Sequence, residues 1–290
     1  MHVRKKKISV SGFLIVLCLC LWGLVLLFPF YNSVLISLVP QHVFQRTPLL
    51  LYPKELTFDS YSYVFHSDLL LTGLRNTIFI VVVGTLYNVL LTVGAAYPLT
   101  KPIPGRRFFT FFIVFTMFFS GGMIPFYLQI KNLHLVNTIW SMILPTGMSV
   151  TYLLIMESYF RTIPAEIEES ARLDGANEID VLFRIVLPLS LPMLATITLF
   201  YGVERWNEWY NGMLFISDVN KYPLQLLIMD MLQSTTSLQA AIPQAQQHQA
   251  AFSLGMQMAA VIASMLPIVC LYPFLQKYFV KGLTLGGVKL

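Results

Sequence analysis

The sequence predicts an all-α membrane protein, and two observations lead to that prediction. Hydrophobic residues make up 56% of the 290-residue chain and charged residues only 11%, whereas an ordinary soluble domain carries about 25% charged residues. The apolar residues also occur in runs long enough to cross a bilayer, which requires about 20 residues per helix. Helices are the expected form of these spans, because lipid offers no partners to backbone polar groups.

We expect about six transmembrane helices in a single transmembrane domain covering residues 1–290. The first span follows a basic N-terminus, as in a signal peptide, but its apolar run exceeds the usual length of about 7–15 residues and no small-residue cleavage motif follows. It is therefore expected to stay uncleaved. The fourth and fifth spans have polar or proline-containing ends, so their limits are the least defined. The six candidates are Phe13–Val39, Leu74–Leu99, Phe108–Gln129, Thr138–Tyr159, Ile185–Arg205 and Gln257–Phe279.

The positive charges predict the orientation of these spans. In this arrangement 13 of the 19 Lys and Arg residues lie on the side of the N-terminus. Because cytoplasmic loops carry the excess of Lys and Arg, both termini are expected in the cytoplasm. The net charge of +5 is for the same reason no indication of nucleic-acid binding. The 13 residues are Arg4, Lys5, Lys6, Lys7, Lys101, Arg106, Arg107, Arg161, Arg172, Arg184, Lys277, Lys281 and Lys289.

The segment between the fourth and fifth spans, about residues 161–184, predicts two short helices joined by a turn on the cytoplasmic side. Pro164 suits the first position of a helix, and Gly175 suits the left-handed residue that ends one. Asn177 can cap the second helix. Apolar residues then recur at helical spacing, which predicts one apolar face. These are Ile179, Leu182, Phe183 and Val186.

Within this segment several residue types stand at fixed spacings: Glu169-Ser170-Ala171, then Gly175, then Ile185-Val186-Leu187-Pro188. This pattern resembles the cytoplasmic signature of the membrane permease subunits of binding-protein-dependent ABC importers, with Ser170 in place of Ala as the one departure. The run RNTIFIVVVGTLYNVLLTVGAAYPLTK is similar to the second span of the carbohydrate-type, maltose-permease-like branch. The C-terminal run KYFVKGLTLGGVKL is similar to a sub-branch associated with complex oligosaccharides.

The resemblance implies the type I permease fold and a coupling loop that inserts into a groove on a cytoplasmic ATPase. In this role Glu169 and Asp174 would make polar contacts, Gly175 would allow the turn, and residues 185–188 would transmit movement to the fifth span. The residues implied in coupling are Glu169, Ser170, Ala171, Asp174, Gly175, Ile185, Leu187 and Pro188.

The same resemblance implies a function and a set of partners. The chain would import an oligosaccharide across the bacterial cytoplasmic membrane. Its partners would be a second, related permease in a heterodimer, two cytoplasmic ATPase subunits and an extracytoplasmic solute-binding protein, within the lipid bilayer. We expect no nucleic-acid partner.

No nucleotide site is expected in the chain itself, and it is not expected to be an enzyme. A phosphate-binding loop requires G-x-x-x-x-G-K-[ST] after a strand. The nearest approach, Gly282–Lys289, has Val288 where the lysine should be. ATP and Mg would therefore be bound by the partner subunits, and this chain is expected to hold no cofactor and no metal.

Two groups of residues are candidates for the solute pathway. Trp206, Asn207, Trp209 and Tyr210 cluster near the expected outer end of the fifth span, and positions 206, 209 and 210 would share one helix face. The alternative is an interfacial aromatic belt. Tyr87 and Asn88 are polar residues within the second span, for which helix–helix hydrogen bonding is an alternative. The polar segment after the fifth span, about residues 207–256, is expected to be an external loop.

Three other functions are alternatives for this sequence. A permease of the same architecture could carry a non-sugar solute, such as an amino acid, a peptide or an anion. A non-transporting membrane scaffold would not need the spacing of the cytoplasmic signature. An intramembrane enzyme is disfavoured, because the five His residues are scattered and neither H-E-x-x-H nor G-x-S-x-G occurs.

Overall fold

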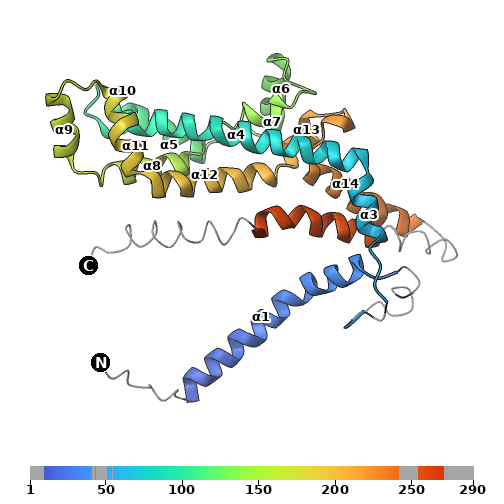
Figure 1. The fold of residues 1–290 in the computed structure, drawn as a ribbon. Coiled ribbons are helices and arrows are strands. Elements are labelled where there is room, and N and C mark those ends of the chain that lie inside the picture. The colour runs from blue at the N-terminus through green and yellow to red at the C-terminus, as the bar shows by residue number, and fades with distance from the viewer. Residues whose placement is uncertain (1–9, 41–42, 44–50, 54, 242–253, 271–290) are drawn as a thin grey trace. The chain divides into compact units, whose positions relative to one another are not determined.

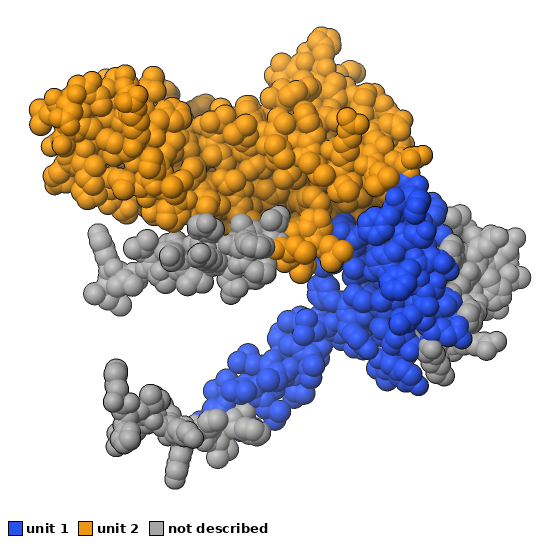
Figure 2. All heavy atoms as spheres, in the orientation of Figure 1, with its two compact units in different colours: residues 1–67, 230–265 blue, residues 68–229, 266–290 orange. Residues whose placement is uncertain are grey.

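The computed structural model describes residues 10–40, 43, 51–53, 55–241 and 254–270, and the regular elements among them are helices. This confirms the all-α fold class. The described residues belong to two compact units, coloured separately in Figure 2. One unit comprises residues 1–67 with 230–265, and the other comprises residues 68–229 with 266–290.

The first unit contains α1 (Val10–Ser37) and the short helix α3 (Asp59–His66). α1 is apolar on all sides, and most of its described side chains are exposed, which is typical of a helix surrounded by lipid. Near its end, the hydroxyl of Ser37 lies 2.8 Å from the hydroxyl of Tyr61 in α3. This bond joins α1 to α3.

The second unit is organised around α4 (Asp68–Thr100), which packs against α8 (Val150–Phe160) and α12 (Leu191–Trp206). Figure 1 shows α4 and α12 side by side. The hydroxyls of Thr92 and Tyr201 lie 2.7 Å apart and fix the register of this antiparallel pair. With 33 residues, α4 is about 50 Å long and exceeds the hydrocarbon core of about 30 Å.

Two of the expected spans are broken at glycine or proline. α5 (Arg106–Phe118) and α6 (Met123–Asn132) replace the third and meet at a bend of 115°. Gly122, at this bend, has φ of +86°, a conformation that glycine adopts without strain. In the fourth, only α7 (Trp140–Ile143) and α8 are helical, and Pro145 lies in the gap between them, where it interrupts helical hydrogen bonding.

The fifth expected span, Ile185–Arg205, also differs from a straight helix. The helical segments Glu178–Leu189 and Leu191–Trp206 meet at 84°. Residues 182–186 form a π-helix, η1, and Pro192 follows at the start of α12. A π-turn and a proline are two recognised causes of a kink, and the helix after the bend begins at Leu191 rather than at Ile185.

By length and composition alone, two helices are able to cross a membrane, or up to four if each bent pair counts as one span. The sixth expected span is described as the helix Leu254–Cys270, and its continuation to residue 279 lies outside the described residues. The segment expected as an external loop contains three helices, and its residues 242–253 also lie outside the described range. These helices are α13 (Tyr210–Phe215), η2 (Val219–Lys221) and α14 (Leu224–Ala241).

The main core joins the loop between the fourth and fifth expected spans to α4, α8 and α12. This loop contains α9 (Ala165–Leu173) and α10 (Glu178–Val181), and α11 (Leu187–Leu189) follows η1. Val181 and Val186 are fully buried there, and burying such a side chain contributes about 1.5–3 kcal/mol. The other buried residues of the core include Val93, Ala96, Tyr97, Leu153, Met156, Phe160, Ile197 and Tyr201.

Candidate functional site

The first helix of the coupling loop ends as the sequence predicts. α9 begins after Pro164, which occupies the capping position rather than the first helical turn. At its other end Gly175 has φ of +90°. The Gly175 N–H donates to the carbonyl of Arg172 at 3.0 Å, and the Ala176 N–H donates to that of Ala171 at 3.0 Å. These two bonds form the glycine-dependent helix ending known as the Schellman motif.

The second helix is capped by Asn177, which confirms that prediction. Its Oδ1 accepts hydrogen bonds from the N–H groups of Ile179 at 2.9 Å and Asp180 at 3.0 Å. The predicted apolar face is only partly correct, because Ile179 is 70% exposed and Phe183 is 58% exposed. α10 has four residues and passes into the π-helix η1, whose wider turn changes which side chains face the core.

The residues implied in coupling fall into two sets. Glu169, Ser170, Asp174 and Gly175 are exposed on α9 and the turn after it. Ala171 on the other side of α9 packs against the main core. In the second set, Leu187 packs against the same core and Ile185 is half-buried, while Pro188 is exposed in α11. The loop thus has an exposed polar side and a side that packs on the membrane helices.

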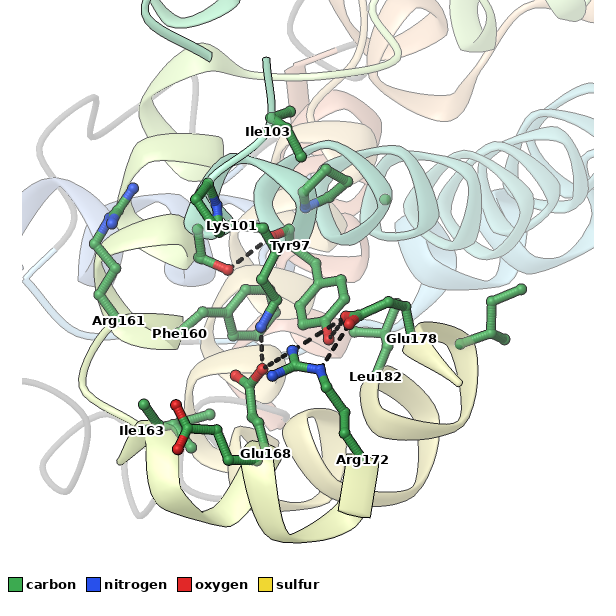
Figure 3. A pocket seen from close by; sticks show the side chains of 17 residues that line it. Tyr97, Lys101, Ile103, Phe160, Arg161, Ile163, Glu168, Arg172, Glu178 and Leu182 are labelled. Atoms are coloured by element: carbon green, nitrogen blue, oxygen red, sulfur yellow. Dashed lines mark hydrogen bonds and ion pairs between the residues drawn. The ribbon is translucent and has the colours of Figure 1, made fainter. Parts of the chain in front are cut away.

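A network of charged and phenolic groups, which sequence reasoning missed, attaches the loop to α4 (Figure 3). Glu168 accepts from Lys101, next to the end of α4, and from Arg172 at 3.0 Å. The Arg172 Nε lies 2.7 Å from Glu178 Oε1, and the Tyr97 hydroxyl donates to Glu178 Oε2 at 2.8 Å. These five residues are called the ion network below.

Two further features bear on the strength of the ion network. The ammonium of Lys101 lies 4.3 Å from the centre of the Tyr97 ring, within the range of a cation–π interaction. The hydrogen bond from Arg172 holds the pKa of the Glu178 carboxyl below its usual range. Glu168 is 9% exposed, so its pairing takes place with restricted access to water. The network borders a cavity of about 900 Å³ between the ends of α4 and α8 and the loop.

A second polar cluster, which we call the arginine cluster, lies between α4, α7 and α12. Arg205 on α12 is 3% exposed, and its guanidinium donates to Asn88 Oδ1 at 2.9 Å and to the Thr146 carbonyl at 2.7 Å. It also donates to the carbonyl of Met142 at 2.5 Å and that of Ile143 at 3.3 Å. The carbonyls of Met142 and Ile143 are at the C-terminal end of α7, and that of Thr146 lies in the break before α8. Arg205 therefore supplies the donors that the broken helix lacks.

The structure separates the residues expected in the solute pathway. Asn88 is 2% exposed and bonded to Arg205, and Tyr87 is half-buried against a second apolar cluster. Their present contacts are interhelical. Trp206 is 9% exposed, whereas Trp209 and Tyr210 are exposed at 36% and 45%.

The prediction that residues 206, 209 and 210 share one helix face is wrong. α12 ends at Trp206, and α13 begins at Tyr210. Asn207 is exposed at the C-terminal cap of α12 and donates its side-chain N–H to the Val203 carbonyl at 2.8 Å. Glu208 accepts from the backbone N–H of Asn211 at 3.2 Å. Local capping bonds of this kind compete with continuation of the helix.

Comparisons with known proteins agree with this architecture. The sequence matches the family described as "Binding-protein-dependent transport system inner membrane component" over residues 9–285. It is 39% identical over 275 residues to "Protein LplC" of Bacillus subtilis (strain 168), covering 92% of this chain and 90% of that protein. It is 35% identical over 290 residues to "Polygalacturonan/rhamnogalacturonan transport system permease protein YtcP" of the same organism, covering 100% of both.

Among solved structures, the fold is similar to a chain of a bacterial ABC transporter described as involved in the import of the acidic polysaccharide alginate. The TM-score is 0.84 at 31% identity, and the match covers 96% of this chain and 99% of the other.

Proposed function

Because the chain belongs to the family of inner membrane components of binding-protein-dependent transport systems, we propose that it is the permease subunit of an ATP-driven importer. The cargo is an oligosaccharide, which a binding protein delivers from outside the cytoplasmic membrane. Both termini and the coupling loop face the cytoplasm, as the distribution of Lys and Arg favours.

The proposed importer has several subunits. A second, related permease pairs with this chain as a heterodimer, and two cytoplasmic ATPase subunits bind ATP and Mg. This chain binds no cofactor and catalyses no reaction. Its contribution is a path for the cargo and a lever on which the ATPases act.

The observation that carries this proposal is the way the coupling loop is exposed on one side and fixed on the other. Glu169 and Asp174 are exposed and available for polar contacts in an ATPase groove. Leu173, Ile179 and Phe183 are apolar residues exposed at 90%, 70% and 58%, which is unusual for a solvated loop but suits a docking surface.

The packed side of the loop contacts the membrane helices in two ways, and each can transmit a movement of the loop to them. Val181 and Val186 are packed in a core shared with α4, α8 and α12, so a shift of α10 reaches α12. The ion network connects α9 directly to the end of α4 through Lys101 and Glu168. A closing motion of the ATPases would therefore move both helices that line the arginine cluster.

The cargo class rests on the relatives. One is named for polygalacturonan and rhamnogalacturonan transport, and another is described as importing alginate. A neutral or acidic oligosaccharide is therefore the proposed cargo, with Tyr87, Asn88, Trp206, Asn207, Trp209 and Tyr210 as candidate pathway residues. A non-sugar solute is the alternative, and binding assays on the cognate binding protein separate the two.

The proposal is tested with the whole transporter. We expect this chain to purify with a second permease of different mass and with an ATPase, and we expect oligosaccharide-loaded binding protein to stimulate ATP hydrolysis in nanodiscs. An active transporter that contains two copies of this chain would contradict the heterodimer. Stimulation by a loaded amino-acid or peptide receptor, but by no sugar, would contradict the cargo.

A further inference from the structure

A carboxylate is exposed on α12 at a depth where the neighbouring helix crosses the bilayer. Glu204 is exposed and precedes the buried Arg205. Arg205 is bonded to Asn88 of α4, which lies 12 residues before Thr100, a rise of about 18 Å. Since α4 exceeds the hydrocarbon core by about 20 Å in total, this level falls inside the core when α4 is centred in the membrane.

The partners of Glu204 are one phenol and its aromatic surroundings. The Tyr152 hydroxyl donates to Glu204 Oε1 at 2.5 Å. The ring of Tyr152 also packs against the ring of Phe200, with centroids 5.5 Å apart, one helical turn before Glu204. Within the described part of the chain, Tyr152 is the hydrogen-bond partner of this carboxylate. Its second oxygen has no hydrogen-bond partner among the described residues.

Arg205 is adjacent to Glu204 in the sequence, but no ion pair joins these two residues in the described structure. Its guanidinium donors are engaged by Asn88 and by the carbonyls of the α7–α8 break. The carboxylate nearest to it is that of Glu208, at 3.8 Å. The formal balance of these three charged residues is one negative charge, and Glu204 is the exposed member.

Exposure at this depth restricts what Glu204 can face. A carboxylate directed at hydrocarbon is strongly unfavourable, and ionisable residues in spans face a bundle interior or a water-filled cavity. The preceding residue, Val203, lies in an apolar groove with Val82 and Leu86 of α4, which is a surface compatible with lipid or another helix. Glu204 instead requires an aqueous surface.

We propose that Glu204 and Tyr152 form a sugar-binding subsite on the wall of the solute pathway. The carboxylate accepts hydrogen bonds from sugar hydroxyls, and the rings of Tyr152 and Phe200 supply apolar surface beside them. The same carboxylate disfavours a cargo unit that carries its own carboxylate, because like charges repel at close range. The subsite rests on the oligosaccharide cargo proposed above and adds a preference for neutral units at this point.

The test compares two probes that differ in charge. Glu204→Gln keeps the size and one acceptor oxygen of the side chain but removes the charge. The probes are trigalacturonate and its methyl ester, each loaded on the binding protein of the complete transporter in nanodiscs. We expect Glu204→Gln to raise the ratio of acid-stimulated to ester-stimulated ATP hydrolysis about tenfold or more. Tyr152→Phe retains the charge and should leave the ratio unchanged.

The location is tested without any cargo. In a chain whose own cysteines are replaced by Ser, the Glu204→Cys variant should react with a membrane-impermeant, water-soluble thiol reagent. The neighbouring Val203→Cys variant is the matched control and should react at least about tenfold more slowly, because its surroundings are apolar.

Either of two results overturns the subsite: equal labelling of the two cysteine variants, or an unchanged probe ratio in Glu204→Gln. If the unsubstituted transporter responds to no oligosaccharide at all, the proposed function fails, and the subsite fails with it. An unchanged probe ratio in a transporter that does respond to oligosaccharides counts against the subsite alone.

Discussion

Replacing Glu168 by Gln is expected to disconnect the coupling loop from α4. Glu168 is paired with Lys101 and Arg172, and the exposed fractions of the side chains are 11%, 18% and 35%. Removing one member of a fully buried ion pair costs about 3–5 kcal/mol, while exposed pairs contribute up to about 1 kcal/mol. For this partly exposed group we expect a loss of about 1–3 kcal/mol in the local stability of α9.

The size of the loss is limited because both cations keep other partners. Arg172 remains bonded to Glu178, and Lys101 remains over the ring of Tyr97. A loss of about 1–3 kcal/mol corresponds to an about 5- to 150-fold larger population of the locally opened state. Amide hydrogen exchange of residues 165–173 in the assembled transporter measures this opening, and transport per ATP hydrolysed measures coupling.

Glu166 supplies the matched control for this prediction. It lies in the same first turn of α9, is exposed, and has no ion pair within the described part of the chain. Glu166→Gln should leave both hydrogen exchange and coupling close to those of the unsubstituted transporter. If Glu168→Gln behaves in the same way as Glu166→Gln, the ion network does not fasten the loop to α4, and that reasoning is refuted.

Three other substitutions test separate parts of the structure. Gly175→Val should cost about 1–2 kcal/mol through its positive φ alone, because an added Cβ meets no atom within 4 Å, and stimulated ATP hydrolysis should fall while insertion is kept. Asn177→Ala removes the cap of α10 and should cost about 1 kcal/mol, seen as faster amide exchange at residues 179 and 180; unchanged exchange would contradict the cap. Arg205→Lys should lower the recovery of complex from membranes, because one ammonium cannot replace the fork of donors, and normal recovery would contradict the role assigned to Arg205.

The local features of the coupling loop could be predicted from the sequence because they depend on a few neighbouring residues. The left-handed turn at Gly175 follows from glycine, and the cap at Asn177 follows from a side chain that bonds the next N–H groups. The ion network could not be predicted in the same way, since Lys101 and Glu168 are 67 residues apart in the sequence. The available signals were the Glu168–Arg172 spacing of four residues and a lysine directly after a span.

Errors in the predicted spans have a common physical cause. Hydropathy identifies an apolar run but does not show where a helix breaks within it. The carbonyls left free between α7 and α8 are satisfied by Arg205, some 60 residues later in the chain, so the break is stable only because of a distant residue. The assumed face of residues 206, 209 and 210 failed for the same reason, because it required a helix that ends at Trp206.

The exposed side of the coupling loop is proposed to dock on an ATPase, and photo-crosslinking tests this docking most directly. A photoreactive amino acid at Leu173, which is 90% exposed, is compared with the same residue at Val219, which is 45% exposed in η2 and far from the loop in the sequence. In the assembled transporter we predict an adduct with the ATPase from position 173 and none from position 219. The opposite pattern, or no ATPase adduct from position 173 in an active transporter, would contradict the claim.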